Sequence, residues 1–199
     1  MGKQTESFSK NLQRWLKGPD TTLGSLNKVF AEKSFAVIFL LMMALPALPL
    51  PTGGVTHITE LITILVSLQL IAGRRVVWLP NRWLKTDAGK LLKGAAGQRL
   101  IRLVVWFEKL PGRRGGWLNH RAFRPAIGFV VLAFTLAAFV APPFSGLDTL
   151  PSLGVVAISL AIIFENLLIL LGGILIGSSG IILEITAGTA IYKGLTHFF

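Results

Sequence analysis

Uncharged apolar segments alternate with basic segments along this chain. A first apolar run covers Ser34 to Leu50 and ends in a proline cluster, and a second covers residues 55 to 72. Later apolar runs cover residues 126 to 141 and 150 to 163. Each run is shorter than the roughly 20 residues that a straight helix needs to cross a bilayer. The pattern therefore predicts short hydrophobic helices that turn at proline-rich tips within a membrane.

Two of the intervening segments have the spacing of amphipathic helices. Residues 5 to 33 repeat apolar side chains at helical intervals, with lysines on the other face. The segment GQRLIRLVVWFEKL shows the same separation, with Arg99 and Arg102 opposite its apolar face. Such helices lie in the plane of the membrane interface, where tryptophan also concentrates. We expect both segments to lie against lipid headgroups.

The two halves of the chain present these elements in the same order. We therefore predict an all-α integral membrane protein made of two repeats, arranged as an inverted repeat. Each repeat combines an amphipathic interfacial helix with short proline-broken transmembrane or re-entrant helices. An alternative interpretation is that the prolines mark loops outside the membrane. The predicted divisions are an N-terminal amphipathic cytoplasmic segment (1–33), a first membrane hairpin (34–72), a basic interfacial segment (73–125), and a second membrane hairpin with a C-terminal transmembrane helix (126–199).

Prolines and glycines set the expected ends of these helices. A further break is expected at GSSG, residues 177 to 180, followed by a last helix from Ile181 to about Thr196. The predicted structural breaks are Pro46, Pro49, Pro51, Gly53, Pro142, Pro143 and Pro151.

Composition supports a lipid environment. Hydrophobic residues make up 52% of the 199 residues, and the formal net charge is +11. Thirteen of the 20 basic residues lie between Arg74 and Arg124, together with two acidic residues. In a hydrophobic chain, this charge favours anionic membrane lipids as partners over nucleic acid, and it places the basic segments on the cytoplasmic side.

The sequence offers no catalytic or metal-binding constellation. It contains no cysteine, and its three histidines are far apart and lack the spacing of metal ligands. We therefore expect no cofactor, no metal and no enzymatic activity.

Ionisable residues within apolar helices are candidates for function, because they are costly to place in lipid. Glu60 forms a polar stripe with Thr56, Thr63 and Ser67, at spacings of four, three and four residues. A helix presents such positions on one face. The stripe is predicted to line a polar cleft in which Glu60 carries a proton or cation. The alternative is that Glu60 lies near the membrane surface and is hydrated there.

Further polar residues end the apolar runs. Glu165 and Asn166 separate two uncharged runs and are predicted to bind substrate or an ion. Arg74 and Arg75 follow the second helix directly, where they bind phosphate or anchor the helix by snorkelling. Gly173 and Gly177 have the spacing of a close-packing motif between membrane helices.

The chain resembles the ExoD family of bacterial exopolysaccharide-synthesis membrane proteins. The resemblance rests on LPALPLPTGG, on LQLIAGRRVVWLP at residues 68 to 80, and on the second proline cluster before a helix with an acidic break. It departs from the family at the acidic break, where Glu165 and Asn166 replace an Asp-Gly pair. The resemblance implies a multi-pass protein of the bacterial inner membrane with a part in exopolysaccharide production. Its proline-broken architecture is also similar to that of DedA proteins, by analogy of fold alone.

These observations lead to one functional hypothesis and one rival. The hypothesis is a small homodimeric transporter or flippase, with a polar cleft between its repeats built around Glu60 and Glu165. Its substrate is a polyprenyl lipid, a polysaccharide precursor or an ion. The rival is a non-transporting scaffold or regulator of the exopolysaccharide machinery.

Overall fold

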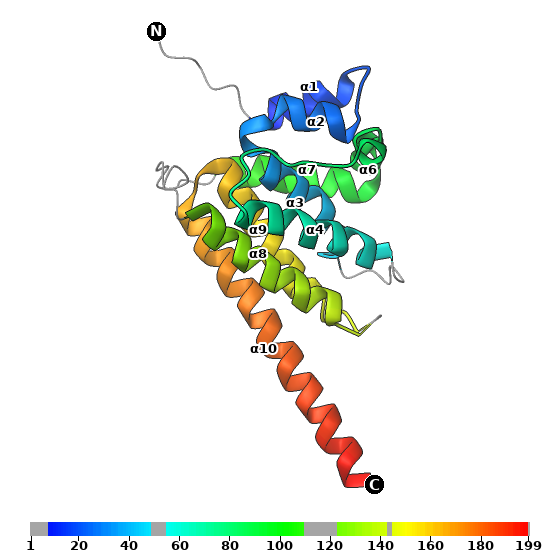
Figure 1. Cartoon of the computed structure of the whole chain (residues 1–199), viewed down its shortest axis with the longest axis vertical. Coiled ribbons are helices and arrows are strands. Elements are labelled where there is room, and N and C mark those ends of the chain that lie inside the picture. Colours follow the sequence, from blue (N-terminus) through cyan, green and yellow to red (C-terminus); the bar gives the residue numbers. More distant parts are fainter. Residues whose placement is uncertain (1–7, 49–54, 110–122, 143–144, 199) are drawn as a thin grey trace.

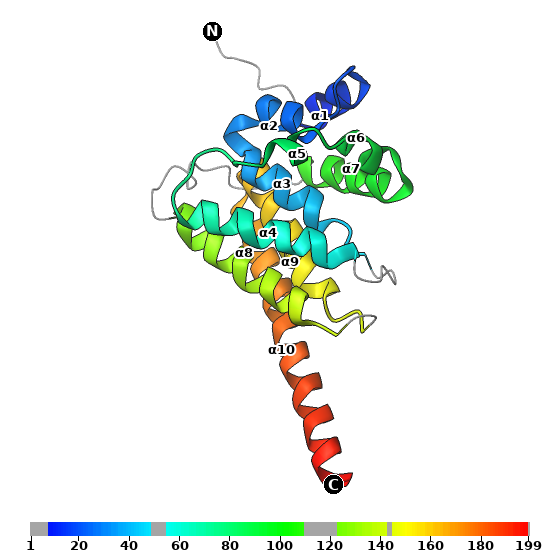
Figure 2. The ribbon, with the colours of Figure 1, turned by 45° about the vertical axis from the view of Figure 1, so that its right-hand side comes forward.

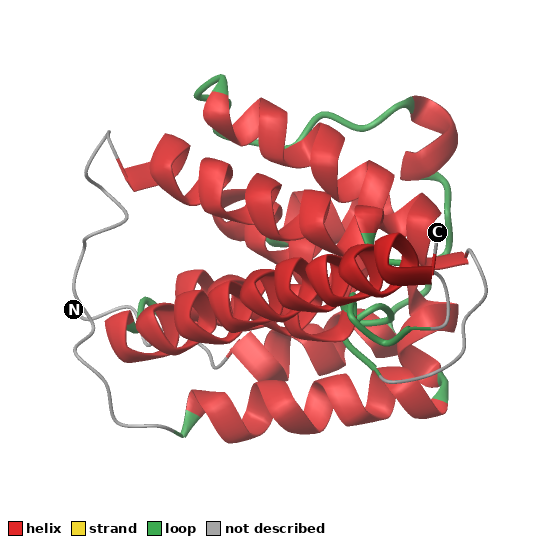
Figure 3. Ribbon diagram, turned by 90° about the horizontal axis from the view of Figure 1, so that it is seen from below, coloured by secondary structure: helices red, strands yellow, loops and turns green. Residues whose placement is uncertain are grey.

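The computed structural model describes residues 8–48, 55–109, 123–142 and 145–198. The secondary structure of these residues is helical (Figure 3), which confirms the predicted all-α class. The helices are α1 Phe8–Lys17, α2 Leu23–Val29, the 3-10 turn η1 Ala31–Lys33, α3 Ser34–Met43, α4 Val55–Ile71, α5 Asn81–Leu84, α6 Ala88–Lys93, α7 Ala95–Glu108, α8 Phe123–Val140, α9 Thr149–Phe164 and α10 Leu167–Phe198.

The helices form a bundle with a layer across one end. Helices α1, α2, α6 and α7 lie at the top of Figure 1, and α3, α4, α8, α9 and α10 form the bundle beneath them. In the bundle, α3 and α8 each pack against both α4 and α9, and α10 packs mainly along α9. Figure 2 shows α4 and α8 side by side and the C-terminal part of α10 extending beyond the other helices.

The bundle is apolar on its outer surface. Helix α3 is buried along its whole length, and α9 is buried from Pro151 to Ile163 apart from a half-buried Leu153. Helices α4, α8 and α10 surround them and expose large apolar side chains: Ile58, Leu61, Leu65, Leu68, Phe129, Leu136, Phe139, Leu168, Leu171, Leu175, Ile182 and Ile185. Soluble proteins rarely expose such extended apolar surfaces. The surface is therefore suited to lipid.

Two of these helices are long and apolar enough to cross a bilayer. They are α8 and, within α10, the segment Leu167–Ala190. The apolar helices α3, α4 and α9 are shorter, and α3 spans only about 15 Å at the rise of an α-helix. Every residue of α3 is buried within the protein.

The two halves of the bundle run in the same direction. Lys33, at the start of α3, donates a hydrogen bond to the carbonyl of Ile163 at the end of α9. Ile71, the last residue of α4, packs against Gly128 near the start of α8. Helices α3 and α8 therefore both begin at the end where α4 and α9 finish. This arrangement differs from the inverted repeat expected from the sequence, because the order of elements fixes no direction.

Only some of the predicted proline breaks fall between helices. Pro46 lies in the turn after α3, and Pro142 follows the end of α8. The prediction for Pro151 was wrong, because this residue is in the first turn of α9, where a backbone N–H has no intrahelical acceptor. The predicted breaks at Pro49, Pro51, Gly53 and Pro143 lie outside the described residues.

The GSSG segment does not break a helix, contrary to the prediction, because α10 continues through it. Its glycines instead allow α10 to approach its neighbours. A Cβ atom at Gly177 would lie 2.1 Å from the ring of Phe134, and one at Gly180 would lie 2.5 Å from Pro151. The packing role predicted for Gly173 and Gly177 is confirmed, but their partners are α9 and, for Gly177, also Phe134 of α8 in the same chain. This glycine face is therefore no argument for a dimer.

The N-terminal segment is also not one continuous helix. Gly18 and Pro19 separate α1 from α2, since proline cannot continue the hydrogen-bonding of the preceding turn. Leu12 and Trp15 on the apolar face of α1 are buried against the chain itself. That face is thus used for packing within the layer.

Asp87 joins the N-terminal helices to α6. Its carboxylate accepts hydrogen bonds from the Thr21 hydroxyl at 2.7 Å and from the backbone N–H of Gly89 at 3.0 Å. The Thr21 hydroxyl, followed by the backbone donors of Lys90 and Gly89, outweighs desolvation and lowers the pKa of Asp87 below its ordinary value. Because the folded pKa is lowered, the ionised carboxylate stabilises this contact above the ordinary pKa. The contribution is lost as pH falls through the lowered value.

We expect Asp87→Ala to loosen the layer, since it removes the acceptor that caps α6 and binds Thr21. Amide hydrogen exchange at Leu23 and in α6 should be faster in Asp87→Ala than in the unmodified protein at neutral pH. The difference should shrink as the solution is acidified through the lowered pKa. Asp87→Asn keeps an acceptor without a charge, so its protection should not vary with pH in this range. Equal exchange in all three proteins would contradict this role.

Candidate functional site

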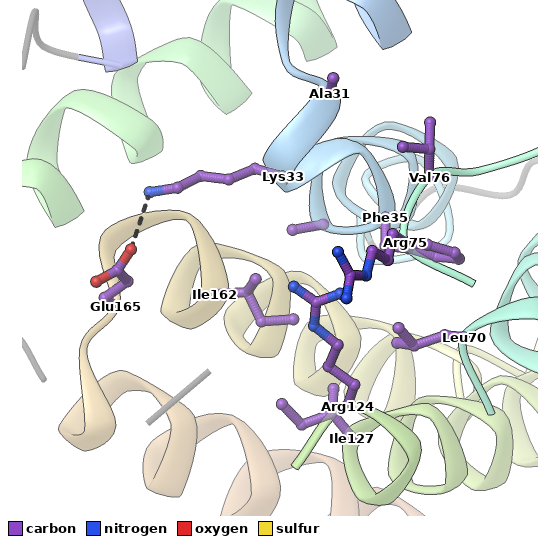
Figure 4. A pocket seen from close by; sticks show the side chains of 11 residues that line it. Ala31, Lys33, Phe35, Leu70, Arg75, Val76, Arg124, Ile127, Ile162 and Glu165 are labelled. Atoms are coloured by element: carbon purple, nitrogen blue, oxygen red, sulfur yellow. Dashed lines mark ion pairs between the residues drawn. The ribbon is translucent and has the colours of Figure 1, made fainter. Parts of the chain in front are cut away.

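A pocket of about 450 Å³ opens where the bundle meets the layer. This volume is in the range of small-molecule sites. Three cationic side chains line the pocket together with one carboxylate and a mainly apolar wall (Figure 4). The lining residues are Ala31, Lys33, Phe35, Ala36, Leu70, Arg75, Val76, Arg124, Ile127, Ile162 and Glu165.

The three cations come from three separate elements. Lys33 is the last residue of η1 and directly precedes α3, while Arg124 is the second residue of α8. Arg75 lies in the segment that follows α4. The side chains of Arg75 and Arg124 approach each other across the pocket in Figure 4. Like charges are thus held close together, an arrangement that favours an anionic occupant.

The segment carrying Arg75 is held by a set of hydrogen bonds. Gly73 adopts a left-handed conformation with φ of 81°, which turns the chain away from α4. The N–H of Trp78 donates to Gln69 Oε1 at 2.8 Å, and Gln69 Nε2 donates to the carbonyl of Trp78 at 3.0 Å. The N–H of Val77 donates to the Ser34 hydroxyl at 3.3 Å. These bonds fix the position of Arg75 relative to the start of α3.

Glu165 and Asn166 form the turn between α9 and α10. Glu165 has a left-handed backbone with φ of 52°, which ends α9, and its carboxylate lies 3.6 Å from the Lys33 ammonium. The side-chain oxygen of Asn166 accepts hydrogen bonds from the N–H groups of Leu168 and Ile169. Asn166 therefore caps α10, and this role explains its burial without a ligand.

A second group of polar residues lies at the other end of the bundle. His57 Nδ1 is 2.8 Å from Glu60 Oε2, and the ring of His57 packs edge-on against Phe139. Asp148, at the start of α9, lies within electrostatic range of His57, Glu60 and Glu184. Burial raises the pKa of Asp148 above its ordinary value, and the charge of His57 partly opposes this rise. We call His57, Glu60, Asp148 and Glu184 the acidic cluster.

The inner face of α4 joins the acidic cluster to the pocket. Thr56, Glu60, Thr63 and Ser67 are buried, while Ile58, Leu61 and Leu65 between them are exposed. Asp148, Ser152 and Ser159 repeat the positions of Thr56, Glu60 and Ser67 at a constant separation of 92 residues. Leu70 and Ile162, which both line the pocket, have the same separation. Corresponding positions of α4 and α9 thus carry polar side chains along the interior of the bundle.

The structure does not bring together the two carboxylates that were predicted to share a cleft. Glu165 and Leu70 both line the pocket, and Glu60 lies about 15 Å from Leu70 along α4 at the rise of an α-helix. Both arginines are exposed, and Arg75 lines the pocket whereas Arg74 does not. Thr63 and Ser67 lie on the buried face of α4, as their spacing indicated.

Three site residues were missed by sequence reasoning, namely Lys33, Arg124 and Asp148. Lys33 and Arg124 each stand at the boundary where a basic segment meets an apolar helix, and that position was the available signal. Asp148 could have been found from the polar spacing of Thr56, Glu60 and Ser67, which recurs at Asp148, Ser152 and Ser159.

The apolar outer surface and the two potential membrane-crossing helices define a helical membrane protein. Residues 8–186 match the protein family described as "Exopolysaccharide synthesis, ExoD", and the chain belongs to this family. An uncharacterized protein from Synechocystis sp. is 24% identical over 147 residues, which cover 70% of this chain and 65% of that relative. The chain thus spans slightly less than two thirds of that relative's length. No solved structure matches the chain.

Proposed function

We propose that this protein moves an anionic polyprenyl lipid across the bacterial inner membrane during exopolysaccharide production, without catalysing a covalent reaction. The observation that carries the proposal is the pocket, in which Lys33, Arg75 and Arg124 lie beside an apolar wall. The family supplies the link to exopolysaccharide synthesis. A polyprenyl phosphate combines an anionic head with a hydrocarbon chain, so one pocket of this kind suits both parts.

The pocket also offers a means of release. Glu165 already lies 3.6 Å from Lys33, so a bound phosphate would compete with this carboxylate for the same ammonium group. Arginine side chains bind phosphate oxygens through paired hydrogen bonds. Binding would therefore draw Lys33 from Glu165 toward the head group, and release would restore the ion pair.

The architecture supports movement of the lipid within the bundle. Helix α3 is too short to cross a bilayer and is enclosed by protein, as expected for a re-entrant helix. Helices α4 and α9 finish at the pocket and carry polar side chains toward the opposite end. A head group passing through the bundle would meet this polar interior while its chain remained in lipid. This passage does not depend on the homodimer expected from the sequence.

Arg124→Gln should weaken binding of farnesyl phosphate, a short polyprenyl phosphate, by roughly 10- to 100-fold. The reason is that a hydrogen bond to a charged group contributes about 1.5–3 kcal/mol. The measurement is calorimetric titration of the purified protein in detergent. Arg74→Gln is the matched control, because Arg74 is an exposed arginine that does not line the pocket. Farnesol and inorganic phosphate should both bind far more weakly than farnesyl phosphate.

Transport is tested separately in vesicles that contain a fluorescent polyprenyl phosphate. In the proposed flippase, the protein should speed transfer of this lipid between leaflets, and Arg124→Gln should slow it. If farnesyl phosphate binds but no transfer occurs, the protein is a lipid-binding scaffold, the rival function. Equal affinities for farnesyl phosphate in Arg124→Gln and Arg74→Gln would rule out the pocket as the binding site.

A further inference from the structure

All titratable side chains of the apolar segments meet in the acidic cluster. In the sequence, residues 34–72 contain His57 and Glu60, residues 126–164 contain Asp148, and residues 166–190 contain Glu184. These ranges contain no lysine or arginine. The fold nevertheless places His57 beside Glu60, and it places Asp148 within electrostatic range of both Glu60 and Glu184. Convergence of costly groups that are far apart in sequence indicates a site, because a chance location would place each one separately.

The cluster lacks a compensating positive charge of its own. The cluster combines three carboxylates with one imidazole, so full ionisation would leave excess negative charge inside an apolar bundle. Neighbouring carboxylates in such surroundings do not all ionise, and the site must take up a cation or hold protons. Among the described residues, no group of His, Asp and Glu side chains has a geometry that would hold a metal ion. The chemistry therefore favours protons.

Unpartnered polar atoms mark where a proton would be held. Glu60 has no exposed surface, and its Oε1 atom makes no hydrogen bond within the described part of the chain. The hydroxyl of Ser152, one turn along α9 from Asp148, is also fully buried and lacks a partner there. A proton on Glu60 would turn an unsatisfied acceptor into a donor.

We propose that the acidic cluster is a proton-binding site, with Glu60 as the carboxyl group that gains and loses the proton. The proton moves onto Glu60 from water by forming an O–H bond, and it leaves by the reverse step, with His57 as the adjacent acceptor. No oxidation or covalent intermediate is involved.

Two charged groups act directly on Glu60, namely His57 on its own helix and Asp148 at the start of α9. Glu184 on α10 lies within electrostatic range of Asp148. Helix α3 has no titratable residue, and the one charged residue of α8, Arg124, lines the pocket at the opposite end. Protonation of Glu60 is therefore governed by the members of the acidic cluster, which titrate together.

The location of the site suggests a role in driving transport, and this part rests on the proposed function. With the basic layer on the cytoplasmic side, the acidic cluster lies at the outward end of the bundle. Hydroxyl groups of Thr63 and Ser67 donate to carbonyls of their own helix, which leaves their oxygens free to accept further bonds. They form a polar connection between the proton site and the lipid pocket.

The proton site is tested on the purified protein in detergent, without any lipid. Infrared difference spectra recorded across a pH titration should show a protonated carboxyl signal that disappears at high pH. Glu60→Gln should remove the part of that signal that comes from the Glu60 carboxyl group, and Ser152→Ala should shift its titration. Asp20→Asn, a change in the layer at the opposite end, should leave it unchanged. Thermal unfolding of each variant verifies that it is folded.

Three results would overturn the proposal: a spectrum of Glu60→Gln identical to that of the unmodified protein, a signal lost equally in Asp20→Asn, or a titration that occurs only when sodium replaces choline in the buffer. The last result would identify a sodium site. Because no lipid is present, this experiment can fail while the pocket still binds farnesyl phosphate.

The coupling of proton binding to lipid transfer is tested in vesicles. A pH gradient should accelerate lipid transfer by the unmodified protein and should have no effect on transfer by Glu60→Gln.

Discussion

Gly177→Val should prevent the bundle from forming its native contact between α9 and α10. A Cβ at this position would lie 2.1 Å from Phe134, and the backbone of Gly154 packs directly against Gly177. Phe134 is itself buried, so its ring has little room to move away. Overpacking of a core costs about 1–3 kcal/mol and occasionally more. Because the ring that would have to move is buried, we expect a loss of stability of about 3 kcal/mol.

Gly172→Val is the matched control for this experiment. A Cβ at Gly172 would have no neighbour within 4 Å, although the two glycines occupy the same helix. Its stability should change by less than about 1 kcal/mol, the scale of helix propensities. Thermal unfolding and size-exclusion profiles in detergent measure both variants. Similar behaviour of Gly177→Val and Gly172→Val would show that α10 does not pack on α9 as described.

Glu60→Met should make the protein more stable while removing its proposed proton site. Glu60 is fully buried with one unpartnered oxygen, and its ion-pair partner His57 keeps access to solvent. Methionine has an unbranched side chain of similar length and introduces no polar atom. An unsatisfied buried polar atom costs about 1–3 kcal/mol, and removing the Glu60 carboxyl leaves no buried charge behind because His57 reaches solvent. We expect a gain in this range.

The comparison with Glu60→Gln separates the causes of this gain. Glutamine removes the charge but keeps a buried polar group, so Glu60→Gln should be less stable than Glu60→Met. Denaturation of all three proteins in the same detergent at neutral pH provides the measurement. A lower stability of Glu60→Met than of the unmodified protein would mean that the carboxyl group is fully satisfied in the fold. The predicted stabilisation by Glu60→Met would then be wrong, and Glu60 would have a structural role.

Individual residues show how much of the fold could be predicted from the sequence. The boundaries of α4 and α8 agree with the apolar runs at residues 55 to 72 and 126 to 141, because helix formation follows local spacing and hydropathy. The predicted end of a helix at GSSG was wrong, because glycine spacing signals a break and a close contact equally well. Only the neighbouring positions of Gly154 and Pro151 distinguish these outcomes.

The candidate sites show the same limit. The stripe on α4 was predicted because its residues are close together in sequence, and their burial agrees with that prediction. The prediction that Glu60 and Glu165 share a cleft was wrong, because no local sequence pattern indicates which ends of distant helices meet. Lys33 and Ile163, which are in contact, are 130 residues apart.

The sequence by itself determined that apolar helices alternate with basic segments and that few ionisable groups occur within them. These properties depend on each residue and its near neighbours. The tertiary structure alone decided that Lys33, Arg75 and Arg124 share a pocket and that four titratable groups from three helices form one cluster. Both sites are assembled by helix packing, in which the shapes of buried side chains and the approach of glycines set the neighbours.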